Sequence, residues 1–136
     1  MTFISRQVVR FAHVDAAGIV FYPRYFEMLN AAVEDYFAIV VGVDFATIHC
    51  KRGLGVPTVK LDAEFKAPSR LGEELDFALS MRRVGRSSAD VSVEVHCAAE
   101  LRLHARLVLV CVDMGTGRAL AWPEDMRPSE AAQIAA

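Results

Sequence analysis

Regular alternation of apolar and polar side chains in the second half of the chain restricts its fold more than any other feature. In residues 59–65 every odd position is apolar and every even position is charged, and residues 89–97 and 101–107 alternate in the same way. Residues 75–81 repeat the pattern more weakly. Because successive side chains of a strand point to opposite faces, we predict four strands, each with one apolar face.

The links between these predicted strands are short. Residues 68–73 and 85–87 carry the Pro, Gly and Ser that are typical of turns, and a third break lies near Glu100. All three links fit hairpins, and one-sided strands joined by hairpins form an antiparallel sheet. Residues 108–112 are apolar on both faces, so we expect a second surface, such as a partner subunit, to cover them.

The first half of the chain contains a strand pattern over residues 2–11 and one long helical pattern over residues 23–41. Pro23 suits the first position of a helix and Gly42 suits its end, and a second short helix is predicted over residues 44–50. One long helix is the cover that a one-sided sheet needs. The predicted architecture is therefore α+β, a five-stranded antiparallel sheet wrapped around one long central helix.

Composition limits the size and the partners of this fold. No repeat, low-complexity tract or linker interrupts residues 1–136, so we predict a single domain, with residues 130–136 adding a final turn or fraying. Fifteen Lys and Arg against 17 Asp and Glu give a net charge of −2, which excludes the basic surface of a nucleic-acid-binding protein. A hydrophobic fraction of 54% and a mean hydropathy of +0.28 favour apolar surface buried between subunits.

The sequence offers no sign of a membrane, secreted or metal-binding protein. The longest apolar run, residues 37–42, is far shorter than the roughly 18 residues that a membrane span needs, and the N-terminus lacks the pattern of a secretory signal. Three widely spaced cysteines do not form a disulfide framework. The adjacent His–Cys pairs at 49–50 and 96–97 lack the spacing of metal ligands. We therefore expect a cytoplasmic protein with no metal site.

An acidic residue in a turn just ahead of the long helix is the strongest candidate for chemistry. Asp15 and Gly18 lie in this turn, and Tyr22 and Pro23 follow at the predicted helix start. The first N–H groups of a helix have no partner inside it, and they attract anions and developing oxyanions. A carboxylate beside such donors suits acyl transfer. An Asp-x-x-Gly turn without any catalytic role explains the same spacing.

The run from residue 11 to residue 37, with Asp15-Ala-Ala-Gly-Ile-Val-Phe-Tyr22-Pro23-Arg-Tyr at its centre, resembles the 4-hydroxybenzoyl-CoA thioesterase family of hotdog-fold acyl-CoA thioesterases. The resemblance implies hydrolysis of an acyl-CoA thioester without a cofactor. It makes Asp15 the catalytic carboxylate, as nucleophile or as base for water, and makes the backbone N–H of Tyr22 the group that polarises the thioester carbonyl. The Tyr22-Pro23 pair resembles the aromatic-acyl branch, so a hydroxybenzoyl group is the first expectation.

The resemblance also implies where coenzyme A would bind. Arg86 and Ser87 match the basic and hydroxyl residues that meet the nucleotide in the family, and Val56 and Thr58 match a region that borders the acyl pocket. A solvated hairpin with surface arginines explains Arg86 and Ser87 equally well, and a plain strand entry explains the other two.

The family further implies a homodimer or homotetramer in which Asp15 and the coenzyme-binding residues come partly from different subunits. Two other functions stay open: a hotdog hydratase or dehydratase that uses His13, and a binding module that holds an acyl-CoA or acyl carrier without consuming it. On the long helix, Glu34 is predicted to face solvent, and Asn30 is predicted to be a polar group in the core near the site.

Overall fold

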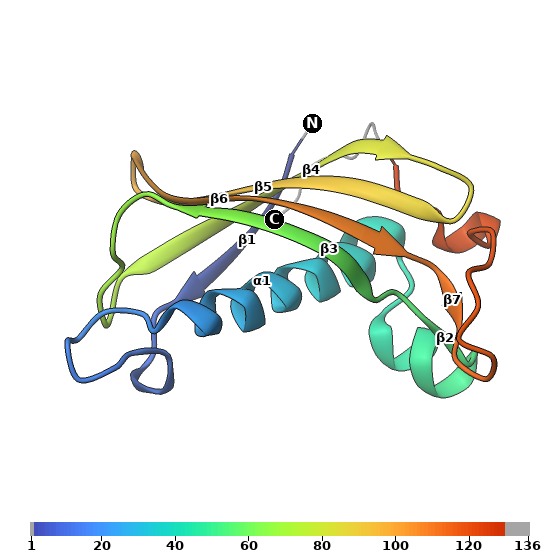
Figure 1. Ribbon diagram of the computed structural model, residues 1–136, viewed down its shortest axis with the longest axis horizontal. Helices are drawn as coiled ribbons and strands as arrows, with labels where there is room; N and C mark the ends of the chain where they lie inside the picture. Colours follow the sequence, from blue (N-terminus) through green and yellow to red (C-terminus); the bar gives the residue numbers. More distant parts are fainter. Residues whose placement is uncertain (1, 130–136) are drawn as a thin grey trace.

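The computed structural model describes residues 2–129 and shows one long helix, α1, lying in the concave face of an antiparallel sheet (Figure 1). The five strands stand in the order β1-β4-β5-β6-β3. Their bounds, with those of the helix, are α1 Tyr22–Tyr36, β1 Phe3–Val8, β3 Thr58–Phe65, β4 Glu74–Val84, β5 Ser88–Cys97 and β6 Glu100–Val110. Two short strands, β2 (Leu54–Gly55) and β7 (Val112–Asp113), pair separately. The predicted fold class is confirmed.

Alternation produces the core as predicted in the middle of the sheet. Phe3, Leu79, Val93 and Ala105 are register partners on successive strands, and all four side chains are fully buried on the face toward α1. The helix α1 packs against this face with buried residues spaced three and four apart. Its buried side chains are Tyr25, Met28, Leu29, Ala32, Val33 and Tyr36. This stripe of apolar side chains makes the helix the cover of the sheet.

The predicted long helix is confirmed, with a change of geometry near its end. It begins at Tyr22, one residue before Pro23, and α-helical geometry ends at Tyr36. The chain continues as a π-helical turn over Phe37–Val41. This turn ends at Gly42, whose N–H donates to the Phe37 carbonyl at 2.7 Å. Gly42 has a φ of +89°, which only glycine adopts without strain. A second short helical turn covers Thr47–Lys51, close to its predicted place.

The first predicted hairpin is wrong, whereas the other two are confirmed. Strands β4 and β5 pair across residues 85–87, and β5 and β6 pair across a two-residue turn after Cys97. Strands β3 and β4 do not pair, because β3 lies beside β6 at one edge and β4 lies between β1 and β5. Residues 66–73 therefore cross the end of the sheet over three strand spacings, about 14 Å. We call this segment the crossover.

Strand β3 also departs from its prediction, because α1 covers its apolar face only in part. Val59, Leu61 and Phe65 are 58%, 38% and 48% exposed, although they alternate with charged residues as a buried strand would. The other edge of β3 faces no strand among residues 2–129. One apolar strip and one open edge of the sheet thus lie together on β3.

The end of the sheet away from the helix start is closed by the C-terminal segment. Trp122 stacks on Phe37, and its indole N–H donates to the Ser88 carbonyl. Leu109 and Cys111 are buried, whereas Val108 is half-buried. The expected final turn over residues 130–136 lies outside the described residues. Over the described part of the chain, no helix has both the length and the apolarity to cross a membrane.

Candidate active site

The predicted turn around Asp15 is a small hairpin. Val14 and Val20 form a bridge, and the Asp15 N–H donates to the Ile19 carbonyl at 3.1 Å. Gly18 has a φ of +78°, and its N–H donates to the Asp15 carbonyl at 2.9 Å. The Asp15 side chain is exposed, and its Oδ1 accepts the Ala17 N–H at 2.9 Å. One carboxylate oxygen is thus held by its own turn.

The start of α1 lies directly beside this hairpin. The Phe21 N–H donates to the His13 carbonyl at 2.9 Å, and the Arg24 N–H donates to the Phe21 carbonyl at 2.8 Å. Tyr22 is the first residue of the helix, so its own N–H has no acceptor one turn back. The positive end of the helix dipole reinforces this donor. The structure therefore places the hairpin that carries Asp15 next to the helix start, where the Tyr22 N–H lacks a partner within the helix.

An apolar cleft of about 320 Å³ opens beside the helix start. Its walls are Ile19, Val20, Tyr22, Tyr25, Phe65, Lys66, Ala67 and Pro68. Phe65 is the centre of an aromatic group, with ring centroids 6.0 Å from Tyr22, 5.8 Å from Tyr25 and 6.2 Å from Phe26. A flat apolar ligand suits such walls. Phe65 was not predicted as a site residue, although it is the last apolar position of the alternating run.

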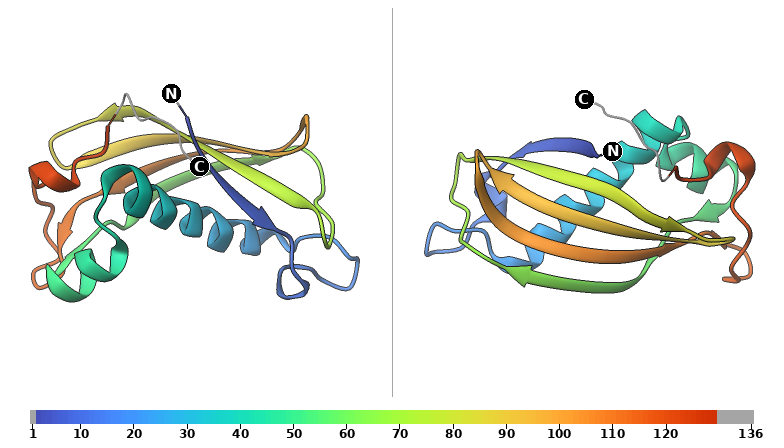
Figure 2. Two further views of the ribbon diagram at one scale, coloured as in Figure 1. Left: turned by 180° about the vertical axis from the view of Figure 1, so that it is seen from behind. Right: turned by 90° about the horizontal axis from the view of Figure 1, so that it is seen from above.

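The four predicted substrate-binding residues, two for coenzyme A and two for the acyl pocket, lie at the opposite end of the sheet. Val56 is buried just before β3, Thr58 is exposed at its start, and Arg86 and Ser87 form the β4–β5 turn. The end of β6 joins them, since the Val110 N–H donates to the Pro57 carbonyl and the Cys111 N–H to the Ser87 carbonyl. Figure 2 shows this end far from the loop before α1.

The length of β3 gives the scale of this separation. Thr58 and Phe65 are the two ends of the strand, seven residue steps apart, which is about 23 Å of extended chain. Asp15 and Tyr22 thus lie toward one end of the sheet and Val56, Thr58, Arg86 and Ser87 toward the other, and we call these two sets the two clusters. A single chain does not bring the two clusters together.

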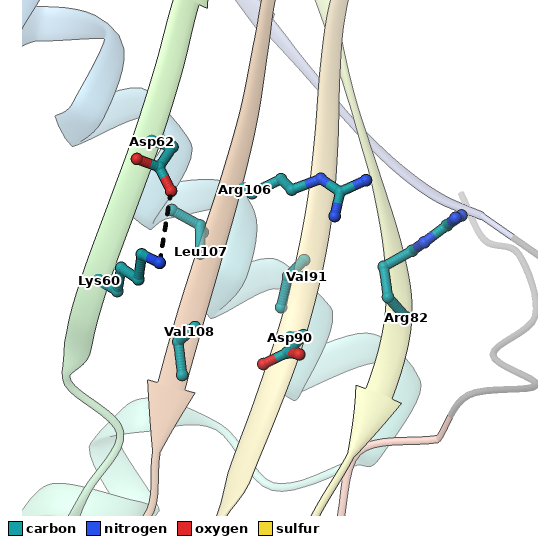
Figure 3. A pocket seen from close by; sticks show the side chains of 8 residues that line it. All are labelled: Lys60, Asp62, Arg82, Asp90, Val91, Arg106, Leu107 and Val108. Atoms are coloured by element: carbon teal, nitrogen blue, oxygen red, sulfur yellow. Dashed lines mark ion pairs between the residues drawn. The ribbon is translucent and has the colours of Figure 1, made fainter.

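A second cavity, of about 190 Å³, lies on the face of the sheet away from α1 (Figure 3). Charged side chains of both signs from four strands line it, and Lys60 and Asp62 form an ion pair at 4.0 Å. This cavity shares no residue with either cluster, so we do not assign it to the active site.

Three polar residues near the helix have clear positions. Glu34 is exposed, as predicted. Asn30 is exposed as well, so its predicted place in the core is wrong: it lies on the face of α1 opposite the buried stripe. The Nδ1 atom of His13 accepts the Arg10 N–H at 2.8 Å, which fixes the ring in the turn before the hairpin.

Comparison with known proteins agrees with this fold. The model of the thioesterase-like superfamily matches residues 9–129. A 1,4-dihydroxy-2-naphthoyl-CoA hydrolase of Synechococcus elongatus is 23% identical over 90% of each chain. The structure of Slr0204, a 1,4-dihydroxy-2-naphthoyl-CoA thioesterase from Synechocystis, superposes with a TM-score of 0.83 at 22% identity and covers 92% of each chain.

A gentisyl-coenzyme A thioesterase of known structure has a TM-score of 0.82 at 21% identity, covering 90% of this chain and 97% of its own. These structural matches confirm the fold, and the family model extends over most of the sequence. The expectation of a thioester hydrolase is thereby confirmed at the level of the family. The chain belongs to the thioesterase-like superfamily.

Proposed function

We propose that this protein hydrolyses an aromatic acyl-CoA thioester to the free acid and coenzyme A, with Asp15 as the catalytic carboxylate. The observation that carries the proposal is the hydrogen bond from Phe21 N–H to the His13 carbonyl, which ties the Asp15 hairpin to the helix start. The aromatic walls of the adjacent cleft support a flat acyl group.

In this proposal the thioester carbonyl oxygen points at the Tyr22 N–H, where the developing oxyanion gains stabilisation. Asp15 either attacks the carbonyl carbon, to form an anhydride that water then cleaves, or takes a proton from the attacking water. Either route adds one water across the C–S bond: the acyl carbon gains oxygen and the thiolate leaves and takes up a proton. The relatives named for dihydroxynaphthoyl and gentisyl thioesters support an aryl group joined directly to the carbonyl, such as 4-hydroxybenzoyl.

We further propose that the active unit is a homodimer, alone or within a homotetramer, in which the open edge of β3 pairs with its own copy. A two-fold axis makes this pairing antiparallel, so the Phe65 end of one strand lies beside the Thr58 end of the other. The Asp15 cluster of one subunit then lies near Val56, Thr58, Arg86 and Ser87 of its partner. The exposed apolar strip of β3 supports this assembly, because such a strip on an edge strand favours pairing.

Release of coenzyme A from a panel of thioesters tests the function. We expect 4-hydroxybenzoyl-CoA and 1,4-dihydroxy-2-naphthoyl-CoA to exceed octanoyl-CoA in kcat/KM, with thiol release followed by a dye. Asp15→Asn is expected to lose roughly 10²–10⁴-fold in kcat. Asp76→Asn, an equally conservative change on β4 that removes an ion pair with exposed Arg6, is the control and retains activity.

Three results would contradict the proposal. Wild-type turnover by Asp15→Asn would show that the acid is not needed. Binding of the thioesters without thiol release would indicate a binding module, and hydration or dehydration of an acyl chain would indicate the hydratase alternative.

A further inference from the structure

We infer that Tyr25, Ser69, Glu73 and Arg102 form a positioning network that fixes the Asp15 hairpin and the start of α1 relative to each other. The kinetic part of this inference rests on the proposed thioesterase function, whereas its structural part does not. We call these four residues the Arg102 network.

The centre of the network is a buried guanidinium. Arg102 lies in β6 with only 8% of its side chain exposed. Burial of a charge is costly unless the charge is paired and hydrogen-bonded. Here Nη1 donates to Glu73 Oε1 at 2.7 Å and Nη2 donates to Glu73 Oε2 at 3.1 Å, a two-pronged ion pair. The Arg102 Nε also lies 2.6 Å from Glu100 Oε1, close enough for an ion pair but not aligned for a hydrogen bond.

Arg102 uses its remaining donor capacity to hold the crossover. Its Nη1 also donates to the Pro68 carbonyl at 3.0 Å and to Ser69 Oγ at 3.1 Å. The Lys66 and Ala67 N–H groups both donate to the Arg102 carbonyl, at 2.8 and 3.3 Å. One residue thereby fixes the segment of chain that forms a wall of the cleft.

The crossover in turn holds both parts of the candidate active site. The buried Tyr25 hydroxyl, in the first turns of α1, donates to Ser69 Oγ at 2.9 Å. The Val20 N–H, two residues before Tyr22, donates to the Ser69 carbonyl at 2.9 Å. Ser69 is fully buried and contacts the helix start with its side chain and the hairpin with its backbone. Without the bonds of this residue, the hydrogen bond from the Phe21 N–H to the His13 carbonyl still joins the two parts, but their relative position is less firmly fixed.

A small displacement at this point matters for catalysis, because an error of 1 Å in positioning costs up to about 10²-fold in rate. A role in stability alone would lower the melting temperature without changing kcat of the folded protein. These two expectations separate a positioning network from ordinary packing.

The test uses Tyr25→Phe and Ser69→Ala, which remove the same hydrogen bond from its two ends. With 4-hydroxybenzoyl-CoA as the probe we expect each variant to lose about 10-fold in kcat with little change in KM. The double variant is expected to lose less than the product of the two single losses, because the residues share one bond. Tyr36→Phe is the matched control: it removes the hydroxyl of another buried tyrosine of α1, which accepts the Ser129 N–H at the far end of the helix. Its kcat is expected to stay at the wild-type value.

Hydrogen exchange of the Val20 amide gives a readout without substrate. We expect this amide to exchange at least about tenfold faster in Tyr25→Phe and Ser69→Ala than in wild type and in Tyr36→Phe. Failure of the wild type to release coenzyme A would overturn the proposed function, while faster exchange would still support the network. Unchanged exchange at Val20 overturns the network. Faster exchange with wild-type kcat in an active enzyme overturns its role in catalysis.

Discussion

Arg102 follows an apolar residue and precedes another, so alternation alone would place it on the outer face with His104 and Arg106. The structure buries it instead, at a point where the pairing of β5 with β6 shifts register between Val95 and His96. The hydrogen bond from the Arg102 guanidinium lowers the pKa of Glu73 to about 2, and the same bond raises the pKa of Arg102. Glu73, the last residue of the crossover, therefore stays ionised and paired with Arg102 at all ordinary pH values.

This lowered pKa predicts a pH dependence of stability. A carboxyl whose pKa falls on folding stabilises the protein above its unfolded pKa, and that contribution is lost as pH falls through the folded value. We expect Glu73→Gln to reduce the free energy of unfolding by roughly 2 kcal/mol at pH 7. The difference between wild type and variant is expected to shrink between the ordinary carboxyl pKa of 4.5 and about 2.

Urea unfolding at several pH values measures this difference. Glu27→Gln, which removes an exposed ion pair with Arg24, is the control and should show little change at any pH. A difference between wild type and Glu73→Gln that stays constant down to pH 2 would contradict the assignment of the effect to Glu73 ionisation.

Phe65 carries a second prediction at the scale of a residue. Its ring lies within 6.2 Å of three other aromatic rings at the cleft. Phe65→Ala is expected to raise KM for 4-hydroxybenzoyl-CoA about tenfold, the effect of roughly 1.4 kcal/mol of lost ring contact. The KM for octanoyl-CoA serves as the internal control and should rise less. An equal rise for both thioesters would show that Phe65 does not select aromatic groups.

Among the elements, the central strands and α1 follow from the sequence because each buries one face along its whole length. Alternation specifies which face of a strand is apolar, but it does not specify which strand lies beside it. Alternation therefore predicts a hairpin where the crossover lies and a buried face on β3, and the structure shows neither. The turn before α1 was predicted from Asp15 and Gly18, since a turn is a local feature. The Arg102 network joins residues far apart in the chain, so no local sequence pattern predicts it.

The β5–β6 turn provides a prediction about a single element. Ala98, at its tip, has a φ of +52° and is the only non-glycine residue with a positive φ in the described chain, residues 2–129. Because alanine is strained there, Ala98→Gly is expected to raise the free energy of unfolding by about 0.5–1 kcal/mol. Ala99→Gly, its neighbour without a positive φ, is the control and should lower it. Thermal or urea unfolding measures both, and a loss of stability in Ala98→Gly would show that the turn is not strained.

At the scale of the whole molecule, the two clusters of candidate site residues lie at opposite ends of the sheet (Figure 2). Asp15 and Tyr22 stand at the start of α1, whereas Arg86 and Ser87 stand at the β4–β5 turn. The proposed pairing of β3 with its copy brings the Asp15 cluster of each subunit beside the Arg86 cluster of the other. A dimer then contains two such sites. Each active site would then depend on two subunits.

Mixing of two impaired variants tests this dependence. Arg86→Glu is expected to raise KM at least about tenfold, because the proposed contact with a phosphate of coenzyme A would be replaced by repulsion. Co-expression of Asp15→Asn with Arg86→Glu should restore about a quarter of wild-type kcat/KM, since half of randomly formed dimers are mixed and each has one intact site. Dimers of either variant alone give the background. Absence of any recovery in verified mixed dimers would place both residues in the same subunit's site.

The path of the crossover has a practical consequence for engineering. Because this one segment connects β3 to β4, forms a wall of the cleft and accepts the bonds of Arg102, a longer version would disturb all three at once. Residues 98–99 are exposed, and their turn has no role beyond linking the adjacent strands β5 and β6. Foreign peptides or labels belong in that turn, and attempts to reshape the acyl preference should replace side chains such as Phe65 without changing the length of the chain.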